Sequence, residues 1–194
     1  MLRRKTRVLV SVVMFFLSFV SLLAFYKLEA SYNEKTWKTI TLGTGLKTGK
    51  EFLYALQKKG CGVSYYAMKM IESPTFASKI APKELKIDLV VVEVADLDLK
   101  NGGTIKDIYT RAAKRGLLPC PAEAGPQLRM QYRDQPVGER LVIAMDSIDL
   151  PTGFSGIFAV EYPEPSGLFL HGGNDGTPEA VYPANTHFVF MKLK

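Results

Sequence analysis

Hydrophobic residues follow three patterns along this chain, and each pattern is typical of one kind of element. The first is an unbroken apolar run, Val8–Phe25, with no charge in 18 residues. Between residues 49 and 116, apolar residues recur at helical spacing. After residue 139, short β-branched and aromatic runs alternate with turn-forming residues, which indicates strands. Helices early and strands late favour an α+β fold, with helices packed on a mainly antiparallel sheet.

Residues with strong local preferences mark the expected element ends. The spacing of Thr48 and Glu51 is that of a capping box at a helix start. The expected helices, given by cap and stop residues, run from Thr48 to Gly60, from Ser64 to Pro74 and from Thr104 to Gly116, with a short helix around 127–132. The expected strands are residues 39–42, 85–97, 140–148, 156–162, 167–170 and 187–193. We interpret Tyr65 and Tyr66 as core or edge aromatics.

The apolar run and its flanking charges are typical of a membrane-targeting segment. Four basic residues and no acidic residue precede it in residues 1–7. As a helix it measures about 27 Å, close to the roughly 30 Å hydrocarbon core of a bilayer. A cleaved signal has a shorter apolar run, of roughly 7–15 residues. Length therefore favours a permanent anchor, while the sequence Leu28-Glu29-Ala30 keeps cleavage near Ala30 open as the alternative.

Both interpretations place the rest of the chain outside the cytoplasm, because basic flanks stay on the cytoplasmic side. We predict a signal-anchor or signal peptide over residues 1–30, a linker over 31–38 and a single domain over 39–194. The expected location is the cell membrane, crossed once by residues 8–25, with the C-terminal domain extracytoplasmic. Cleavage would instead give a secreted or periplasmic protein.

The net charge is +6 for the whole chain, but export makes the charge of the exported part the relevant quantity. Residues 1–30 hold five of the 25 basic and one of the 19 acidic residues, which leaves 20 basic and 18 acidic residues, a net charge of +2. A nearly balanced domain has no bulk electrostatic attraction for nucleic acid. We therefore expect no nucleic-acid partner.

The two cysteines, Cys61 and Cys120, leave two outcomes open. In an oxidising compartment an even pair is a disulfide candidate, and the alternative is two separate buried thiols. Two cysteines and two histidines far apart in the sequence do not have metal-ligand spacing. We expect neither a metal site nor a cofactor.

Residues 120–136 form the densest polar stretch of the exported part, framed by prolines. Prolines reduce the entropy cost of holding a loop in one shape. Side chains so held are suited to bind a polar ligand, to serve in acid–base chemistry or to form an internal network. The candidate residues are Glu123, Gln127, Arg129, Tyr132 and Asp134.

The segment from Gly102 to Ile148 contains CPAEAGPQLRMQYRDQP. In this pattern it resembles a family of uncharacterised bacterial proteins that share CPAExGPQLRxQYxDQP. The resemblance extends to the final FVF strand and implies a bacterial origin and a periplasmic or extracytoplasmic location. It implies no activity, and it draws attention to the five polar residues above.

Three functional hypotheses follow, and the sequence does not decide whether the protein is an enzyme. The first is a non-enzymatic module that binds an unknown protein or a small polar ligand. The second is an extracytoplasmic hydrolase that uses Glu123 or Asp134 as acid and base, with Arg129 orienting an anionic group. The third is a structural role for the polar segment, as a tie between the helical and strand halves. Exposure distinguishes them, because a tie is buried and a binding site is not.

Overall fold

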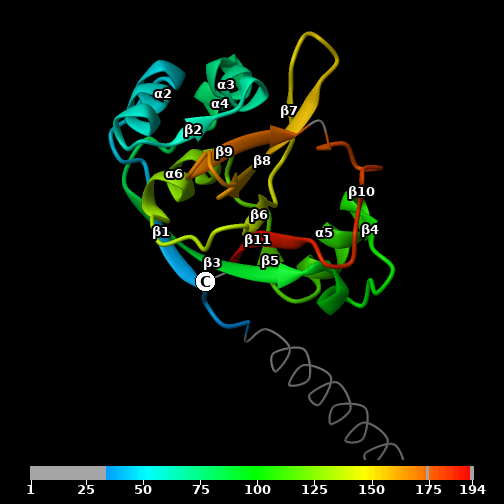
Figure 1. Ribbon diagram of the computed structural model, residues 1–194. Coiled ribbons are helices and arrows are strands. Elements are labelled where there is room, and N and C mark those ends of the chain that lie inside the picture. The colour runs from blue at the N-terminus through cyan, green and yellow to red at the C-terminus, as the bar shows by residue number, and fades with distance from the viewer. Residues whose placement is uncertain (1–33, 174, 193–194) are drawn as a thin grey trace, which may run out of the picture. The chain divides into compact units, whose positions relative to one another are not determined.

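A mostly antiparallel sheet carries the described part of the chain, which comprises residues 34–173 and 175–192 of a computed structural model. Its strands lie in the order β1-β3-β11-β6-β8-β9-β2, with β5 paired to β11 and β7 paired to β8 (Figure 1). Among the described strands of this sheet, only the β11–β6 and β2–β9 pairs are parallel. The predicted α+β class, with helices and a mainly antiparallel sheet, is confirmed.

The bounds of the elements follow the chain from residue 38. The strands are β1 (Lys38–Leu42), β2 (Gly62–Val63), β3 (Leu85–Glu93), β4 (Gly103–Thr104), β5 (Leu117–Leu118), β6 (Arg140–Ile143), β7 (Ile148–Asp149), β8 (Ser155–Glu161), β9 (Phe169–Gly173), β10 (Val181–Tyr182) and β11 (His187–Lys192). The helices are α2 (Gly49–Lys58), α3 (Tyr65–Glu72), α4 (Pro74–Ser78), the 3₁₀ helix η1 (Val94–Leu97), α5 (Ile105–Ala113) and α6 (Ala124–Gln131).

The three predicted helix caps are confirmed. The hydroxyls of Thr48, Ser64 and Thr104 each accept a hydrogen bond from the N–H three residues later. Pro74 differs from the prediction, because it begins the short helix α4 as well as ending α3. A proline suits the first helical position, where its missing N–H has no partner within the helix. Ser73 caps this new helix.

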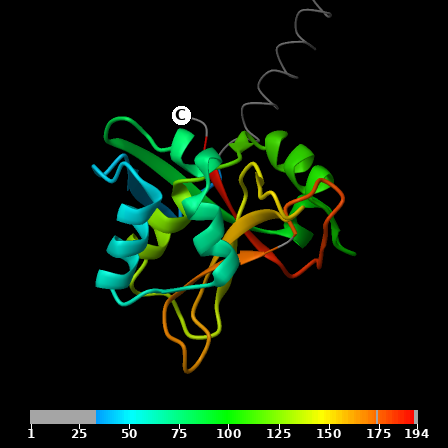
Figure 2. The same ribbon diagram turned by 90° about the horizontal axis from the view of Figure 1, so that it is seen from above.

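Helix α6 lies inside the curl of the sheet. It contacts β1, which stands at one end of the strand order, and also β8 and β9 near the other end. The sheet therefore bends around α6, and Figure 1 shows α6 between β1 and β9. Seen from above (Figure 2), α2 and α3 lie together on one side of the strands, while α5 lies apart from them, beside β4 and β5.

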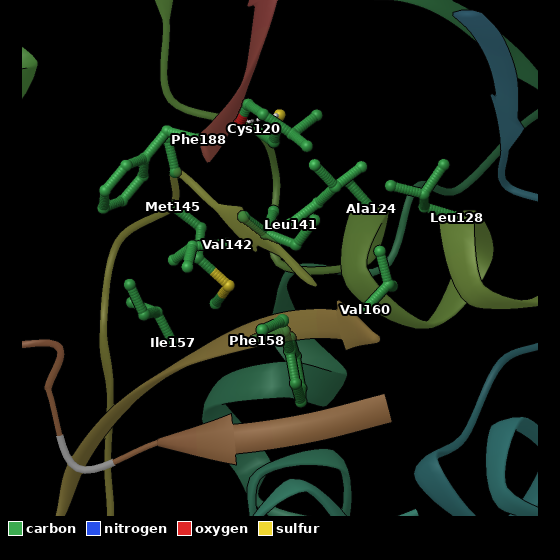
Figure 3. Close-up of a cluster of buried hydrophobic side chains, with 14 of the residues drawn as sticks. Cys120, Ala124, Leu128, Leu141, Val142, Met145, Ile157, Phe158, Val160 and Phe188 are labelled. Atoms are coloured by element: carbon green, nitrogen blue, oxygen red, sulfur yellow. Dashed lines mark hydrogen bonds between the residues drawn. The ribbon is translucent and has the colours of Figure 1, made fainter. Parts of the chain in front are cut away.

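The strand expected over residues 140–148 is interrupted. Strand β6 ends at Ile143 and β7 begins at Ile148. Between them the backbone of Ala144 bonds to both Cys120 and Val189, so the chain leaves β8 there. Figure 3 shows the core around this point, where Cys120 and Met145 lie among Val142, Ile157, Phe158 and Phe188.

The expected membrane segment, residues 8–25, lies outside the described residues, as does the proposed cleavage point near Ala30. No helix within residues 34–173 and 175–192 combines the length and the apolar character that a bilayer span requires.

Candidate functional site

Helix α6 and its flanks hold the predicted polar residues in the interior. Glu123 and Tyr132 are the residues that bound the helix, and Ala124 to Met130 are all buried. Pro126 is tolerated because it lies in the first turn, where N–H groups have no partner within the helix. Gly125 allows α6 to approach β8, since a Cβ there would come within 2.7 Å of the Phe158 ring. The packing of α6 thus decides the exposure of the polar segment.

Glu123 is completely buried, and its carboxylate accepts hydrogen bonds from two distant backbone segments. The Gly43 N–H donates to Oε1 at 2.8 Å, and the Ala81 N–H donates to Oε2 at 2.8 Å. The Gln127 amide donates to Oε1 at 2.9 Å. These bonds join α6 to the loop after β1 and to the loop before β3.

A ladder of three side chains at four-residue spacing continues this connection along α6. The Gln127 Nε2 also donates to the Thr44 hydroxyl at 2.7 Å. Gln131 forms two bonds with the Thr41 backbone, accepting from its N–H at 2.9 Å and donating to its carbonyl at 2.8 Å. Gln131 also donates to Gln127 Oε1 at 3.1 Å. Gln131 was not among the five candidates, although its spacing from Glu123 and Gln127 indicates a shared helix face.

Arg129 belongs to a second buried network and does not meet Glu123. Its Nη1 donates to Gln135 Oε1 and, at 3.3 Å, to the Glu161 carbonyl. Its Nη2 donates to the Tyr132 carbonyl. The side chain is fully buried, and its Nε has no hydrogen-bond partner within the described structure. Burial lowers the pKa of this guanidinium from its ordinary value.

Tyr132 and Asp134 occupy different environments. Tyr132 is buried with its ring edge against Trp37, and its hydroxyl donates to Glu139 Oε2 at 2.9 Å. Burial, reinforced by the hydrogen bond to Glu139, raises the pKa of this phenol. Asp134 has an 81% exposed side chain and forms an ion pair with Lys38 at 3.6 Å.

The five predicted residues therefore contribute to two internal networks and one surface ion pair, rather than to one open cleft. Both oxygens of Glu123 bind backbone donors away from solvent, while Asp134 faces solvent. This arrangement fixes three segments against α6: the loop after β1, the loop before β3 and the loop that contains Gln135. In the part of the chain that the structure describes, no group of three His, Cys, Asp or Glu side chains is placed to hold a metal ion.

Of the two outcomes left open for the cysteines, the structure has the second, because Cys61 and Cys120 are both free, buried thiols. Cys120 packs in the core, where its sulfur lies 3.6 Å from the Val189 carbonyl oxygen (Figure 3). Burial raises the pKa of this thiol. Cys61 lies between α2 and β2, where Arg133 Nη1 donates to its sulfur at 3.1 Å. Each sulfur therefore has its own neighbours, and no disulfide joins the two segments.

An exposed groove of about 470 Å³ lies between the start of α3 and the loop that joins β7 to β8. We call it the tyrosine groove. It is lined by Tyr65, Tyr66, Lys69, Glu72, Ser73, Pro74, Leu150, Pro151 and Thr152. Tyr65 is 64% and Tyr66 is 47% exposed, so the interpretation of this pair as core or edge aromatics is wrong. The buried face of α3 is formed by Ala67, Met70 and Ile71, and the two tyrosines lie away from this face.

Ring contacts hold the aromatic side chains of the tyrosine groove in place. Tyr66 stacks on the buried Phe154 ring, with centroids 4.3 Å apart and planes 8° apart, and Tyr65 meets Tyr66 edge to face. Lys69 lies over the Tyr65 ring and pairs with Glu72 at 3.0 Å. The ion pair raises the pKa of Lys69, mainly through the hydrogen bond that its ammonium donates to Glu72. The groove thus combines fixed aromatic surfaces with paired charges.

Comparison with known proteins identifies no relative of this chain. No family model matches the chain, and neither a curated protein nor a solved structure matches it. Assignment of a function therefore rests on the residues described above.

Proposed function

We propose that this protein is an exported, membrane-anchored binding module without catalytic activity. We further propose that its tyrosine groove receives an extended, uncharged segment of a partner protein, rich in proline and aliphatic residues. The observation that carries the proposal is the exposure of Tyr65 and Tyr66 side by side in this groove. Large aromatic side chains exposed to solvent together are typical of binding sites. The groove that they line has a volume of about 470 Å³, which is in the range of ligand-binding pockets.

The chemistry of the lining favours a peptide over a small polar ligand. Apolar surface comes from the tyrosine rings, Pro74, Leu150 and Pro151. The Ser73 hydroxyl is already used, because it accepts from the Phe76 N–H and donates to the Met70 carbonyl. Few polar groups remain to bind the hydroxyls of a sugar. Aromatic grooves of this kind receive extended proline-rich segments, which expose carbonyl acceptors along their length.

Electrostatics and rigidity support the same ligand. Lys69 and Glu72 pair with each other, so the groove offers no net charge from this pair to a charged partner. Tyr66 is fixed by its stacking on Phe154 before any ligand arrives. A preformed aromatic surface loses little conformational entropy on binding, which leaves more of the contact energy as affinity.

Export and anchoring rest on the sequence. The basic residues before an 18-residue apolar run support an anchor at residues 8–25. The bacterial resemblance of the segment after Gly102 supports an extracytoplasmic domain. Protease added to intact spheroplasts should degrade the domain of the membrane-bound chain. A domain that stays protected until the cells are lysed would contradict export.

The hydrolase hypothesis gains no support from the geometry. It needs Glu123 and Asp134 to converge on one open cleft beside Arg129. Instead Glu123 bonds to backbone N–H groups in the interior, while Asp134 pairs with Lys38 at the surface.

Peptide binding is testable with defined probes. A fluorescent peptide of alternating alanine and proline is titrated with the full-length protein in detergent, and a glycine–serine peptide of equal length serves as the negative probe. Tyr65→Ala should weaken binding of the proline peptide by about tenfold, because a stacked aromatic contact contributes about 1–2 kcal/mol. Tyr54→Ala is the matched control, because Tyr54 is 66% exposed on α2 and does not line the groove.

Three results would overturn the proposed ligand. Equal affinity for the two peptides would show that the groove does not select extended proline segments. Equal weakening by Tyr65→Ala and Tyr54→Ala would show that binding lies elsewhere. A titration with uncharged oligosaccharides that binds tightly, and is lost in Tyr65→Ala, would replace the peptide by a small polar ligand.

A further inference from the structure

A second pocket, of about 400 Å³, lies where the start of β6 meets the turn that joins β10 to β11. We call it the charged pocket. Its volume is in the range of small-molecule sites. It shares no lining residue with the tyrosine groove, so the two are separate sites. Its lining includes Arg140, Asp175, Val142, Val181 and Pro183.

Asp175 brings to this pocket a carboxylate without a cationic partner. Its Oδ1 is buried and has no hydrogen-bond partner within the described structure. Gly173 allows this position, because a Cβ on Gly173 would overlap Oδ1. Buried charges in proteins are normally paired, since an isolated ion loses its hydration. A cationic group of a ligand would supply the missing partner.

Arg140 brings the opposite charge to the same pocket. Its side chain is 45% exposed, and its Nη1 lies 3.6 Å from Glu161 Oε2, which is too long for a hydrogen bond. Glu161 also pairs with His171 at 3.6 Å. A guanidinium carries five N–H donors in a fork that matches the two oxygens of a carboxylate. Arg140 can therefore receive an anionic group without giving up a hydrogen bond to Glu161.

The two charges remain available because they do not neutralise each other. Arg140 forms its ion pair with Glu161, which does not line the pocket, while Asp175 Oδ1 stays without a partner. A ligand that carries only a carboxylate would meet Asp175 as a like charge. A ligand that carries only an ammonium group would meet Arg140 in the same way. The pocket thus discriminates against both kinds of singly charged ligand.

We propose that the charged pocket binds a small zwitterion, a free amino acid with an aliphatic chain between its ammonium and carboxylate groups. The ligand carboxylate pairs with Arg140, and the ligand ammonium pairs with Asp175. Val142, Val181 and Pro183 provide apolar surface for the methylene groups of the chain. Val181 is 71% exposed, so a ligand would remove apolar surface from water there.

Isothermal titration calorimetry of the full-length protein in detergent tests the ligand class. The probes are glycine, β-alanine, 4-aminobutyrate and 6-aminohexanoate, which place the two charges at increasing separation. Each probe is compared with the alkanoate and the alkylamine of equal chain length, which carry one charge each. We expect at least one amino acid to bind about tenfold more tightly than both of its analogues, because it alone makes both charged contacts.

Two isosteric variants test the assignment of the contacts. Arg140→Gln should weaken binding of the preferred amino acid about tenfold and bring its affinity close to that of the alkylamine. Asp175→Asn should weaken it similarly and bring its affinity close to that of the alkanoate. The matched controls are Arg111→Gln and Asp146→Asn, because both residues form surface ion pairs and neither lines the pocket.

The outcomes that overturn the proposal are distinct from those of the peptide experiment. Absence of binding by all four amino acids would overturn it, and so would equal affinity for an amino acid and its two analogues. Binding weakened equally by the pocket variants and by their controls would place the ligand elsewhere. Tyr65→Ala should leave amino acid binding unchanged, since Tyr65 lines only the tyrosine groove.

Discussion

Removal of the Glu123 carboxylate should destabilise the domain strongly. In Glu123→Ala the N–H groups of Gly43 and Ala81 lose their acceptor while they remain in the partly buried junction. Each unsatisfied buried donor costs about 1–3 kcal/mol, so the free energy of unfolding should fall by about 4 kcal/mol. The Gln127 amide keeps the Thr44 hydroxyl and adds little to this loss.

Urea unfolding of the full-length protein in detergent measures this loss. Trp37, the single tryptophan, packs against Tyr132 near the end of α6 and reports on the same region. With a slope of about 2 kcal/mol per molar urea, the midpoint should fall by about 2 M. Glu123→Gln keeps one acceptor oxygen but turns an amide N–H toward a backbone N–H, so we expect a loss of about half that size.

Glu51→Ala is the matched control for Glu123. The Glu51 carboxylate also accepts a backbone bond, from the Lys47 N–H, but it is exposed to water. Water replaces the lost acceptor, so the free energy of unfolding should change by about 0.5 kcal/mol. A loss below about 1 kcal/mol in Glu123→Ala, or one no larger than in Glu51→Ala, would refute the conclusion that Glu123 is a buried tie.

Two further predictions concern the buried phenols and the contact of α6 with β8. Burial raises the pKa of Tyr109 and Tyr182 above 10.0 in the folded state, so the folded chain holds more protons than the unfolded chain at high pH. Their contribution to stability should be complete below about pH 10 and should disappear as the pH rises beyond it, and urea midpoints that stay constant into that range would contradict the shift. Gly125→Ala should lower the free energy of unfolding by about 2 kcal/mol, because the new methyl group meets the Phe158 ring at 2.7 Å. Thermal melting measures the change, Phe158→Leu in the same chain should recover part of it, and a neutral or stabilising Gly125→Ala would show that α6 has room to move.

Local signals determined the ends of the helices. A hydroxyl such as that of Thr48 or Ser64 reaches the N–H three residues later within its own turn, so the preference needs no distant partner. The same holds for the chain reversal at Gly60, whose positive φ of 67° suits glycine. Runs rich in β-branched residues likewise identified β3, because both faces of a central strand are covered.

Exposure of the polar segment was decided only by the tertiary structure. The sequence shows Glu123, Gln127 and Arg129 together, but the same residues suit a binding loop and a buried network. The curl of the sheet around α6 places backbone donors from the loops near Gly43 and Ala81 beside Glu123, 80 and 42 residues away along the chain. No local pattern encodes such a contact.

The exposure of the tyrosine pair and the choice between the two outcomes for the cysteines also depended on tertiary contacts. Aromatic character predicts burial only for residues on the helix face that meets the core, and Tyr65 and Tyr66 lie away from the buried face formed by Ala67, Met70 and Ile71. An even cysteine count predicts a bridge only when the two sulfurs meet, and here the folded chain gives Cys61 and Cys120 different neighbours. The sequence by itself determined most of the local elements, because these depend on neighbours along the chain. Only the tertiary structure decided which polar groups are internal, since contacts between distant residues set their access to water.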